Sequence, residues 1–203
     1  SILYRQVHYE RDGRLRHGVA TNHLTEVEVG SCLEVEIKHN PTFKMPASAK
    51  TPIMMVGAGT GLAPYIGFMQ AREQQLSANG GLSAMGEAKL FFGESTEKHH
   101  GLCCEQLLSW QSQGLVQLIT AFSRDQAHKI YIQDRIIEQG SAVFDMLQAG
   151  GHLYICGSQT RLAVGVKQAL LQVFAKEGSM SEEQANQYWE QLRKDKRLQQ
   201  DIY

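Results

Sequence analysis

Three glycines at alternate positions end an apolar run and form the most chemically suggestive pattern in the chain. Ile53–Val56 are four consecutive apolar residues, and Gly57, Gly59 and Gly61 follow, with Thr60 before the last glycine. Because glycine has no Cβ atom, a glycine turn lets backbone approach an anion closely. The N–H groups at the start of a helix attract phosphate, and a Thr60 hydroxyl would add a donor. The pattern predicts a phosphate-binding turn, although a tight connection without a ligand has the same appearance.

The spacing of these glycines limits which phosphate-binding motif they form. It is G-x-G-x-G, which differs from the G-x-G-x-x-G dinucleotide fingerprint. No Gly-Lys-Ser/Thr follows, which disfavours the phosphate loop of an NTPase. Pro64 suits the first turn of a helix, and residues 65–76 are mostly helix formers. The stretch therefore predicts a strand, a glycine turn and a helix.

A second group of polar residues follows the predicted strand Val116–Phe122 and suits a phosphate dianion. Guanidinium and ammonium groups bind phosphate through charge-assisted hydrogen bonds, and a nearby tyrosine ring can stack on adenine. A free ribose hydroxyl would favour an acidic residue instead, so this group predicts a 2′-phosphate. The alternative is that the two cations only solvate a loop. The group consists of Ser123, Arg124, Lys129, Tyr131 and Gln133.

Three further candidates lie toward the C-terminus. Cys156 ends the predicted strand His152–Cys156, where its sulfur would face a reacting centre if a cleft forms there; otherwise it is a small core residue. Asp201 and Tyr203 are the other two. The aromatic ring of Tyr203 either has no role at this position, or it is a mobile lid that stacks on a planar ligand.

The elements that must position these residues alternate between strand and helix after residue 52. We expect strands at 53–56, 88–92, 116–122 and 152–156, and helices at 65–76, 102–112, 130–139, 142–148, 160–176 and after the Ser181–Gln184 capping box. Such alternation predicts an α/β fold with a doubly wound parallel sheet. Ligands of these sheets bind beyond the carboxyl ends of the strands, and the candidate residues follow those ends.

The N-terminal part lacks this alternation. We expect strands over residues 1–10 and 31–38 and a hairpin turn at 11–14, without helical crossovers, as in the end of a β-barrel. The segment Gly18-Val19-Ala20-Thr21 could start a helix at Thr21 and form a second anion site, or it is an ordinary capped turn. We place the domain boundary between residues 47 and 48, which gives domains 1–47 and 48–203.

Composition narrows the class of protein. The 203 residues carry a net charge of −1, which leaves no electrostatic footprint for nucleic acid or a membrane surface. No apolar run is long enough to span a bilayer, and no signal peptide is recognised. The four cysteines lack zinc-type spacing, so we expect no metal site and a reduced, cytoplasmic protein. The first residue is Ser1 rather than Met, which suggests a piece of a longer chain.

Taken together, these segments resemble a known family. From Tyr9 onward the chain is similar to the C-terminal part of the diflavin NADPH reductases, which are related to ferredoxin–NADP reductase. The likeness is greatest to the sulfite reductase flavoprotein and NADPH–hemoprotein reductase types. The segments that carry it occur in matching order and spacing: Gly18–Thr21, Pro52–Pro64, Ala121–Arg124, Lys129–Gln133, Tyr154–Gly157 and Asp201–Tyr203.

The resemblance implies cofactors and a role for each candidate. It implies that Gly18, Val19, Ala20 and Thr21 bind the FAD pyrophosphate, and that 1–47 is the end of an FAD-binding barrel before an NADP-binding domain. Gly59 and Thr60 would bind NADP near its pyrophosphate and nicotinamide, and the group around Arg124 would bind the 2′-phosphate and adenosine. Cys156 and Asp201 would assist hydride transfer, and Tyr203 would cover the flavin and move aside for the nicotinamide.

The chain also departs from the family pattern. Ala58 stands where proline is usual and Ser158 where aspartate is usual, and the stretch 94–104 lacks the family's acidic and aromatic residues. The Arg-x-Tyr-Ser/Thr flavin motif and the FMN domain are absent from this sequence. By itself this chain is therefore expected to hold FAD poorly and to be inactive.

The implied function is that of an NADPH-dependent flavoprotein reductase. Hydride would pass from NADPH to FAD, and electrons would pass to FMN in a domain outside this chain or a flavodoxin-like carrier, and then to a heme or iron–sulfur protein. Two alternatives remain at this stage: a single-flavin ferredoxin or flavodoxin–NADP reductase, and a non-catalytic NADP-binding module. The final acceptor and the oligomeric state do not follow from the sequence.

Overall fold

The chain forms two compact units, Ser1–Asn40 and Pro41–Tyr203. A computed structural model describes residues 2–38, 40–78, 81–96, 104–126 and 128–203.

The first unit contains a short hairpin and a helix. Strands β1 (His8–Arg11) and β2 (Arg14–His17) pair antiparallel. Asp12 and Gly13 have φ values of 54° and 68°, the left-handed conformations that a two-residue hairpin turn favours. The predicted turn is therefore confirmed, whereas the strand predicted over residues 1–10 is confined to its C-terminal end. Helix α1 spans Val19–Glu26 and begins two residues before the predicted start.

The strand predicted over residues 31–38 is wrong. Residues 31–38 have no regular secondary structure and belong to no sheet. Its apolar residues alternate as in a strand, but Val35 and Ile37 are 66% and 93% exposed. Alternation alone does not make a strand, because the backbone needs a neighbour to bond, and the described part of this unit pairs only β1 with β2.

A five-stranded parallel sheet forms the centre of the second unit, and it confirms the predicted fold class. The order is β5-β4-β3-β6-β7, and every neighbouring pair is parallel. The strands are β3 (Ile53–Ala58), β4 (Ala88–Glu94), β5 (Gln117–Phe122), β6 (His152–Gly157) and β7 (Leu198–Ile202). Four were predicted to within two residues at either end; β7 was not, because its polar sequence resembles a tail.

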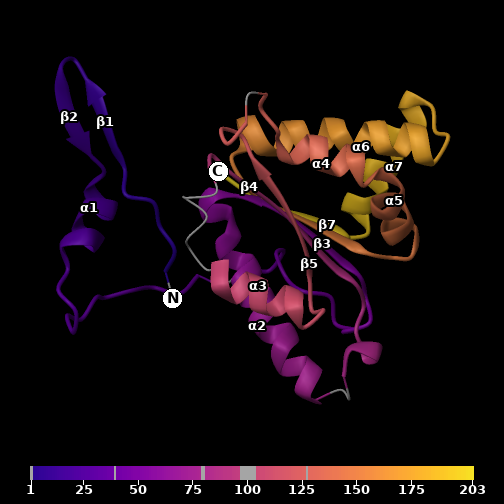
Figure 1. Cartoon of the computed structure of the whole chain (residues 1–203), viewed down its shortest axis with the longest axis horizontal. Helices are drawn as coiled ribbons and strands as arrows, with labels where there is room; N and C mark the ends of the chain where they lie inside the picture. The colour runs from indigo at the N-terminus through magenta and orange to yellow at the C-terminus, as the bar shows by residue number, and fades with distance from the viewer. Residues whose placement is uncertain (1, 39, 79–80, 97–103, 127) are drawn as a thin grey trace. The chain divides into compact units, whose positions relative to one another are not determined.

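Helices cover both faces of this sheet (Figure 1). Helices α2 (Ala63–Ala78) and α3 (Cys104–Ser112) lie on one face. The other face carries α4 (Ile132–Glu138), α5 (Gly140–Gln148), α6 (Val164–Glu177) and α7 (Glu182–Lys194). The predicted beginning of α3 at Leu102 lies outside the described residues.

The long helix predicted from Thr160 begins differently. Residues Gln159–Ala163 form a single π-helical turn before α6, and such turns are frequent at functional sites. The face predicted to be apolar is confirmed as core, with Val166 and Leu170 completely buried. The predicted capping box of α7 is also present, because Ser181 Oγ accepts from the Gln184 backbone N–H at 3.2 Å and Gln184 Oε1 accepts from Ser181 N–H at 2.8 Å.

The strand order contains a topological switch point between β3 and β6. The chain adds β4 and β5 on one side of β3 and then returns to add β6 and β7 on the other side. Loops that leave β3 and β6 therefore diverge at the carboxyl edge of the sheet, which is where ligands of such folds bind.

Candidate functional site

The glycine turn lies directly against the end of β6. Residues Gly59–Leu62 form a 3-10 turn that leads into α2. Gly59 has a φ of 54°, a left-handed conformation that favours glycine. A Cβ atom at Gly61 would overlap the carbonyl oxygen of Cys156. Glycine at this position thus allows the backbone of the turn to touch the backbone of β6.

Tyr65 ties the two strands at the switch point together. Its hydroxyl donates to the backbone oxygens of Val56 in β3 (2.8 Å) and Tyr154 in β6 (3.1 Å). Burial, with the nearby Cys156 and Asp201 as lesser causes, raises the pKa of Tyr65 well above its ordinary value, so the hydroxyl remains a donor. Sequence reasoning missed this residue, because a tyrosine in a helical stretch gives no sign of which carbonyls its hydroxyl will reach.

Cys156 is a buried, neutral thiol at the carboxyl edge. It pairs in register with Gly57 of β3 on one side and with Asp201 of β7 on the other. Burial, followed by the negative charge of Asp201, raises the pKa of Cys156 to about 12. At neutral pH the residue therefore offers a protonated sulfur to its surroundings, and it is unsuited to act as a nucleophile.

Tyr203 reaches from the end of β7 back to the glycine turn. Its hydroxyl lies 3.0 Å from Thr60 Oγ1. Its backbone N–H donates to the Gly157 oxygen (3.2 Å), and its own carbonyl accepts from Gln159 N–H (3.0 Å). The residue is nevertheless 69% exposed. The structure thus gathers Thr60, Cys156, Asp201 and Tyr203 at the ends of β3, β6 and β7.

The second predicted group lies at the same edge of the sheet, on the other side of β3. Ser123 and Arg124 follow β5. Their backbone N–H groups donate to the oxygen of Glu94 at the end of β4 (3.1 Å) and to that of Ser95, the next residue (2.8 Å). The side chain of Arg124 is exposed, and within the described ranges it forms no ion pair. A guanidinium positioned in this way is available to a ligand anion.

The rest of this group continues along the loop and into α4. Lys129 is exposed. Tyr131 precedes the first turn of α4, where its backbone N–H donates to Asp134 Oδ2 at 2.7 Å, and 43% of the residue is exposed. The amide group of Gln133 lies next to Gly165 in α6. Cations and an aromatic ring are therefore presented from one loop and one helix start.

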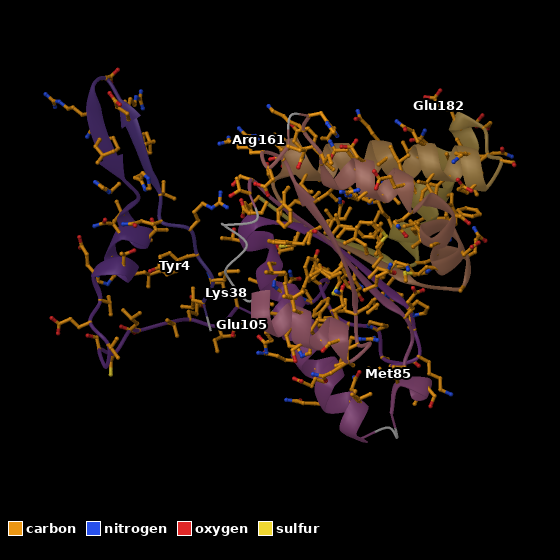
Figure 2. All side chains as sticks on the ribbon, viewed as in Figure 1. Tyr4, Lys38, Met85, Glu105, Arg161 and Glu182 are labelled. Atoms are coloured by element: carbon orange, nitrogen blue, oxygen red, sulfur yellow. The ribbon has the colours of Figure 1, made fainter. Side chains whose placement is uncertain are left out.

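One exposed cation at this edge was not singled out from the sequence. Arg161 lies in the π-helical turn after β6, and its side chain is exposed (Figure 2). Met85, just before β4, marks the opposite edge of the sheet (Figure 2). Its place in the sequence, four residues after the strand-ending Gly157, could have identified Arg161 as a candidate site residue.

The predicted FAD segment belongs to the first unit. The first bond of helix α1 runs from Asn22 N–H to Gly18 O (2.9 Å), so the backbone N–H groups of Val19, Ala20 and Thr21 precede the helical ladder. Thr21 Oγ1 accepts from Val7 N–H at 3.0 Å. This helix start has the donors that a pyrophosphate requires.

Two features are absent from the described residues. No group of three or more His, Cys, Asp or Glu side chains there is arranged to hold a metal ion. In the same part of the chain, none of the helices has the length and apolar character needed to cross a membrane.

Comparison with known proteins gives consistent matches. A family model described as an oxidoreductase NAD-binding domain matches residues 55–168. The chain is 41% identical over 199 residues to the sulfite reductase [NADPH] flavoprotein alpha-component of Yersinia pestis bv. Antiqua, covering 97% of this chain and 32% of the relative. The proteins of the same name from Cronobacter sakazakii and Photorhabdus laumondii are 43% and 42% identical over the same shares. The chain thus spans about a third of the length of these curated relatives.

Proposed function

Since this chain belongs to the family of oxidoreductase NAD-binding domains, we propose that it binds NADPH across the carboxyl edge of its sheet, as part of a flavoprotein reductase. NADPH is the substrate that supplies hydride, and FAD is the cofactor that accepts it. The names of the relatives, sulfite reductase [NADPH] flavoprotein alpha-component, support an activity of that type for the whole protein.

One observation carries the proposal. Thr60, Cys156 and Tyr203 meet on one side of the switch point, and the Arg124 group lies on the other side at the same edge. A dinucleotide with a phosphorylated adenosine at one end and a flat, reactive ring at the other end needs both groups. The exposed cations suit the 2′-phosphate, and the glycine turn suits the pyrophosphate.

The residues near the reacting end would act without forming bonds to the substrate. Cys156 presents an uncharged thiol that orients the nicotinamide. The exposed carboxylate of Asp201, one strand away, steadies positive charge that develops on that ring. Tyr203 excludes water and covers the site until the nicotinamide arrives.

The proposal extends to cofactors and partners beyond this chain. We assign Gly18–Thr21 to FAD because the start of α1 exposes backbone donors. Electrons would continue to FMN in a further domain or a flavodoxin-like carrier, and then to a heme or iron–sulfur protein. A cytoplasmic location is supported by the cysteines, since Cys32 and Cys156 are both free thiols.

The 2′-phosphate assignment is tested with Arg124→Ala in the full chain. Loss of a charge-assisted contact weakens binding by about 1.5–3 kcal/mol, so calorimetry should show a large loss of NADP⁺ affinity and little change for NAD⁺. Arg193→Ala is the matched control, because Arg193 pairs with Glu190 on α7 (3.0 Å), away from this edge. Equal losses for both nucleotides, or none, would contradict the assignment.

A further inference from the structure

Helices α4 and α6 pack against each other, and both begin at the carboxyl edge of the sheet (Figure 1). The side chain of Ile132, the first residue of α4, packs against Gly93 near the end of β4. Helix α6 follows β6 through the π-helical turn Gln159–Ala163. The contact between the beginnings of these two helices therefore involves the Arg124 group, to which Gln133 of α4 belongs.

The side chain of Gln133 lies across α6 at Gly165. Beyond the backbone of its own helix, a Cβ atom at residue 165 would have the Cδ, Oε1 and Nε2 atoms of Gln133 as its nearest neighbours, at 3.3, 3.3 and 3.4 Å. Because three atoms of one planar group are almost equally distant from this point, the amide presents its flat face to Gly165. A methyl group at residue 165 would force the amide to shift by a few tenths of an ångström.

The backbone of α6 does not itself require glycine at this position. Gly165 lies within the helix and is not one of the described residues with a positive φ, so alanine could adopt the same conformation. Glycine inside a helix is less favourable than alanine, because it loses more conformational freedom on folding. The space that glycine leaves at residue 165 is occupied by the amide of Gln133.

The amide of Gln133 is available to a ligand. The residue is half-buried, and in the described part of the chain its amide has no hydrogen-bond partner. Neither its nitrogen nor its oxygen is one of the described buried polar atoms that lack a partner, so both atoms reach solvent. A primary amide has two N–H donors and a carbonyl acceptor, and its N–H can donate to a phosphate oxygen.

We propose that Gly165 is a positioning residue, whose missing side chain lets the Gln133 amide lie against α6 and bind the phosphorylated adenosine of NADPH. The proposal rests on the function proposed above, because it concerns the same nucleotide site. Gly165 acts only through Gln133. Since packing against α6 already restricts the amide before the nucleotide arrives, little further side-chain freedom is lost on binding, and the hydrogen bond contributes more to affinity.

Gly165→Ala in the full chain separates helix stability from nucleotide binding. Alanine favours the helix, and the space for its methyl group is occupied by the movable end of a side chain, so the urea midpoint should not fall. The displaced amide should weaken binding of 2′,5′-ADP about three- to tenfold, as measured by calorimetry. A purely structural role for Gly165 does not predict a loss of affinity with stability retained.

Two further variants assign the effect to the amide. Gly67→Ala is the matched control, because Gly67 also lies within a helix, α2, and a Cβ there meets no atom within 4 Å; its affinity for 2′,5′-ADP should be unchanged. Gln133→Ala removes the amide and should weaken binding at least as much as Gly165→Ala does. In the Gln133→Ala chain, adding Gly165→Ala should cause no further loss, because both substitutions act on one amide.

The outcomes distinguish this role of Gly165 from the function on which it rests. If Gly165→Ala or Gln133→Ala binds 2′,5′-ADP as the wild type does, or if Gly165→Ala reduces affinity equally in the Gln133→Ala background, the role is wrong and the nucleotide site stands. A lower urea midpoint for Gly165→Ala would show that the glycine is needed for packing, which also contradicts the proposal. A wild-type chain that binds neither NADP⁺ nor 2′,5′-ADP overturns the proposed function and this role with it.

Discussion

Cys156 and Cys32 show how strongly the surroundings of a residue determine its chemistry. Both are free thiols, but Cys32 is exposed and Cys156 is buried between β3 and β7. The sequence shows two cysteines of the same type, and the strand position of Cys156 predicted only that it would be either core or active. The nearby carboxylate of Asp201, which helps to raise the pKa of this thiol to about 12, comes from a strand that sequence reasoning missed.

The thiol environment predicts a difference in reactivity. At pH 7.5, iodoacetamide should modify Cys32 quickly and should modify Cys156 at no more than about a tenth of that rate. The thiolate is the reacting form, and burial restricts access to it. Peptide mapping by mass spectrometry would follow each cysteine separately. In urea both should react at similar rates, and similar rates in the folded chain would show that Cys156 is not protected.

At the scale of elements, those with a local sequence pattern could be predicted, whereas those that depend on contacts between distant residues could not. Apolar runs predicted β3, β4 and β6, and the capping box predicted the start of α7. The polar strand β7 was missed because it is a strand only by virtue of pairing with β6. The reverse error at residues 31–38 has the same cause, since an alternating pattern without a bonded neighbour stays unpaired chain. The Tyr65 bonds and the Thr60–Tyr203 contact likewise depend on residues distant in sequence.

The junction between the glycine turn and β6 predicts a sharp contrast between two glycines. Gly61→Ala should destabilise the chain by about 1–3 kcal/mol, because the new methyl group would overlap the Cys156 carbonyl and force the turn away from β6. Gly67→Ala, in helix α2 just after the turn, meets no atom within 4 Å and should be neutral or slightly stabilising. Urea unfolding measures both. Similar stabilities for the two variants would show that the turn is not closely packed on β6.

At the scale of the whole molecule, the sheet carries a pH-sensitive residue away from the candidate site. His152, the first residue of β6, is half-buried, and its Nδ1 lies 3.4 Å from Tyr154 Oη. Burial, followed by the positive charge of Arg197, lowers the pKa of His152 below its ordinary 6.5. The unfolded chain therefore takes up a proton at a higher pH than the folded chain does.

This difference predicts how stability depends on pH. The free energy of unfolding should decrease as the pH falls below about 6.5 and level off once folded His152 is also protonated. Urea midpoints at pH 7.5 and 5.5 should show the decrease, and His152→Gln should reduce it. His128→Gln changes an exposed histidine and should not. An unchanged decrease in His152→Gln would assign the effect to other groups.

The order of the five strands has one more consequence. A molecule that touches both the Arg124 loop and Tyr203 must lie crosswise over β4, β3 and β6, since these separate the two outermost strands. Such a molecule contacts the middle of the second unit at Arg124 and its end at Tyr203, and it is attached to each half of the sheet. When bound, the molecule would therefore oppose separation of the sheet between β3 and β6. At a saturating concentration it would raise the denaturant concentration needed to unfold the second unit.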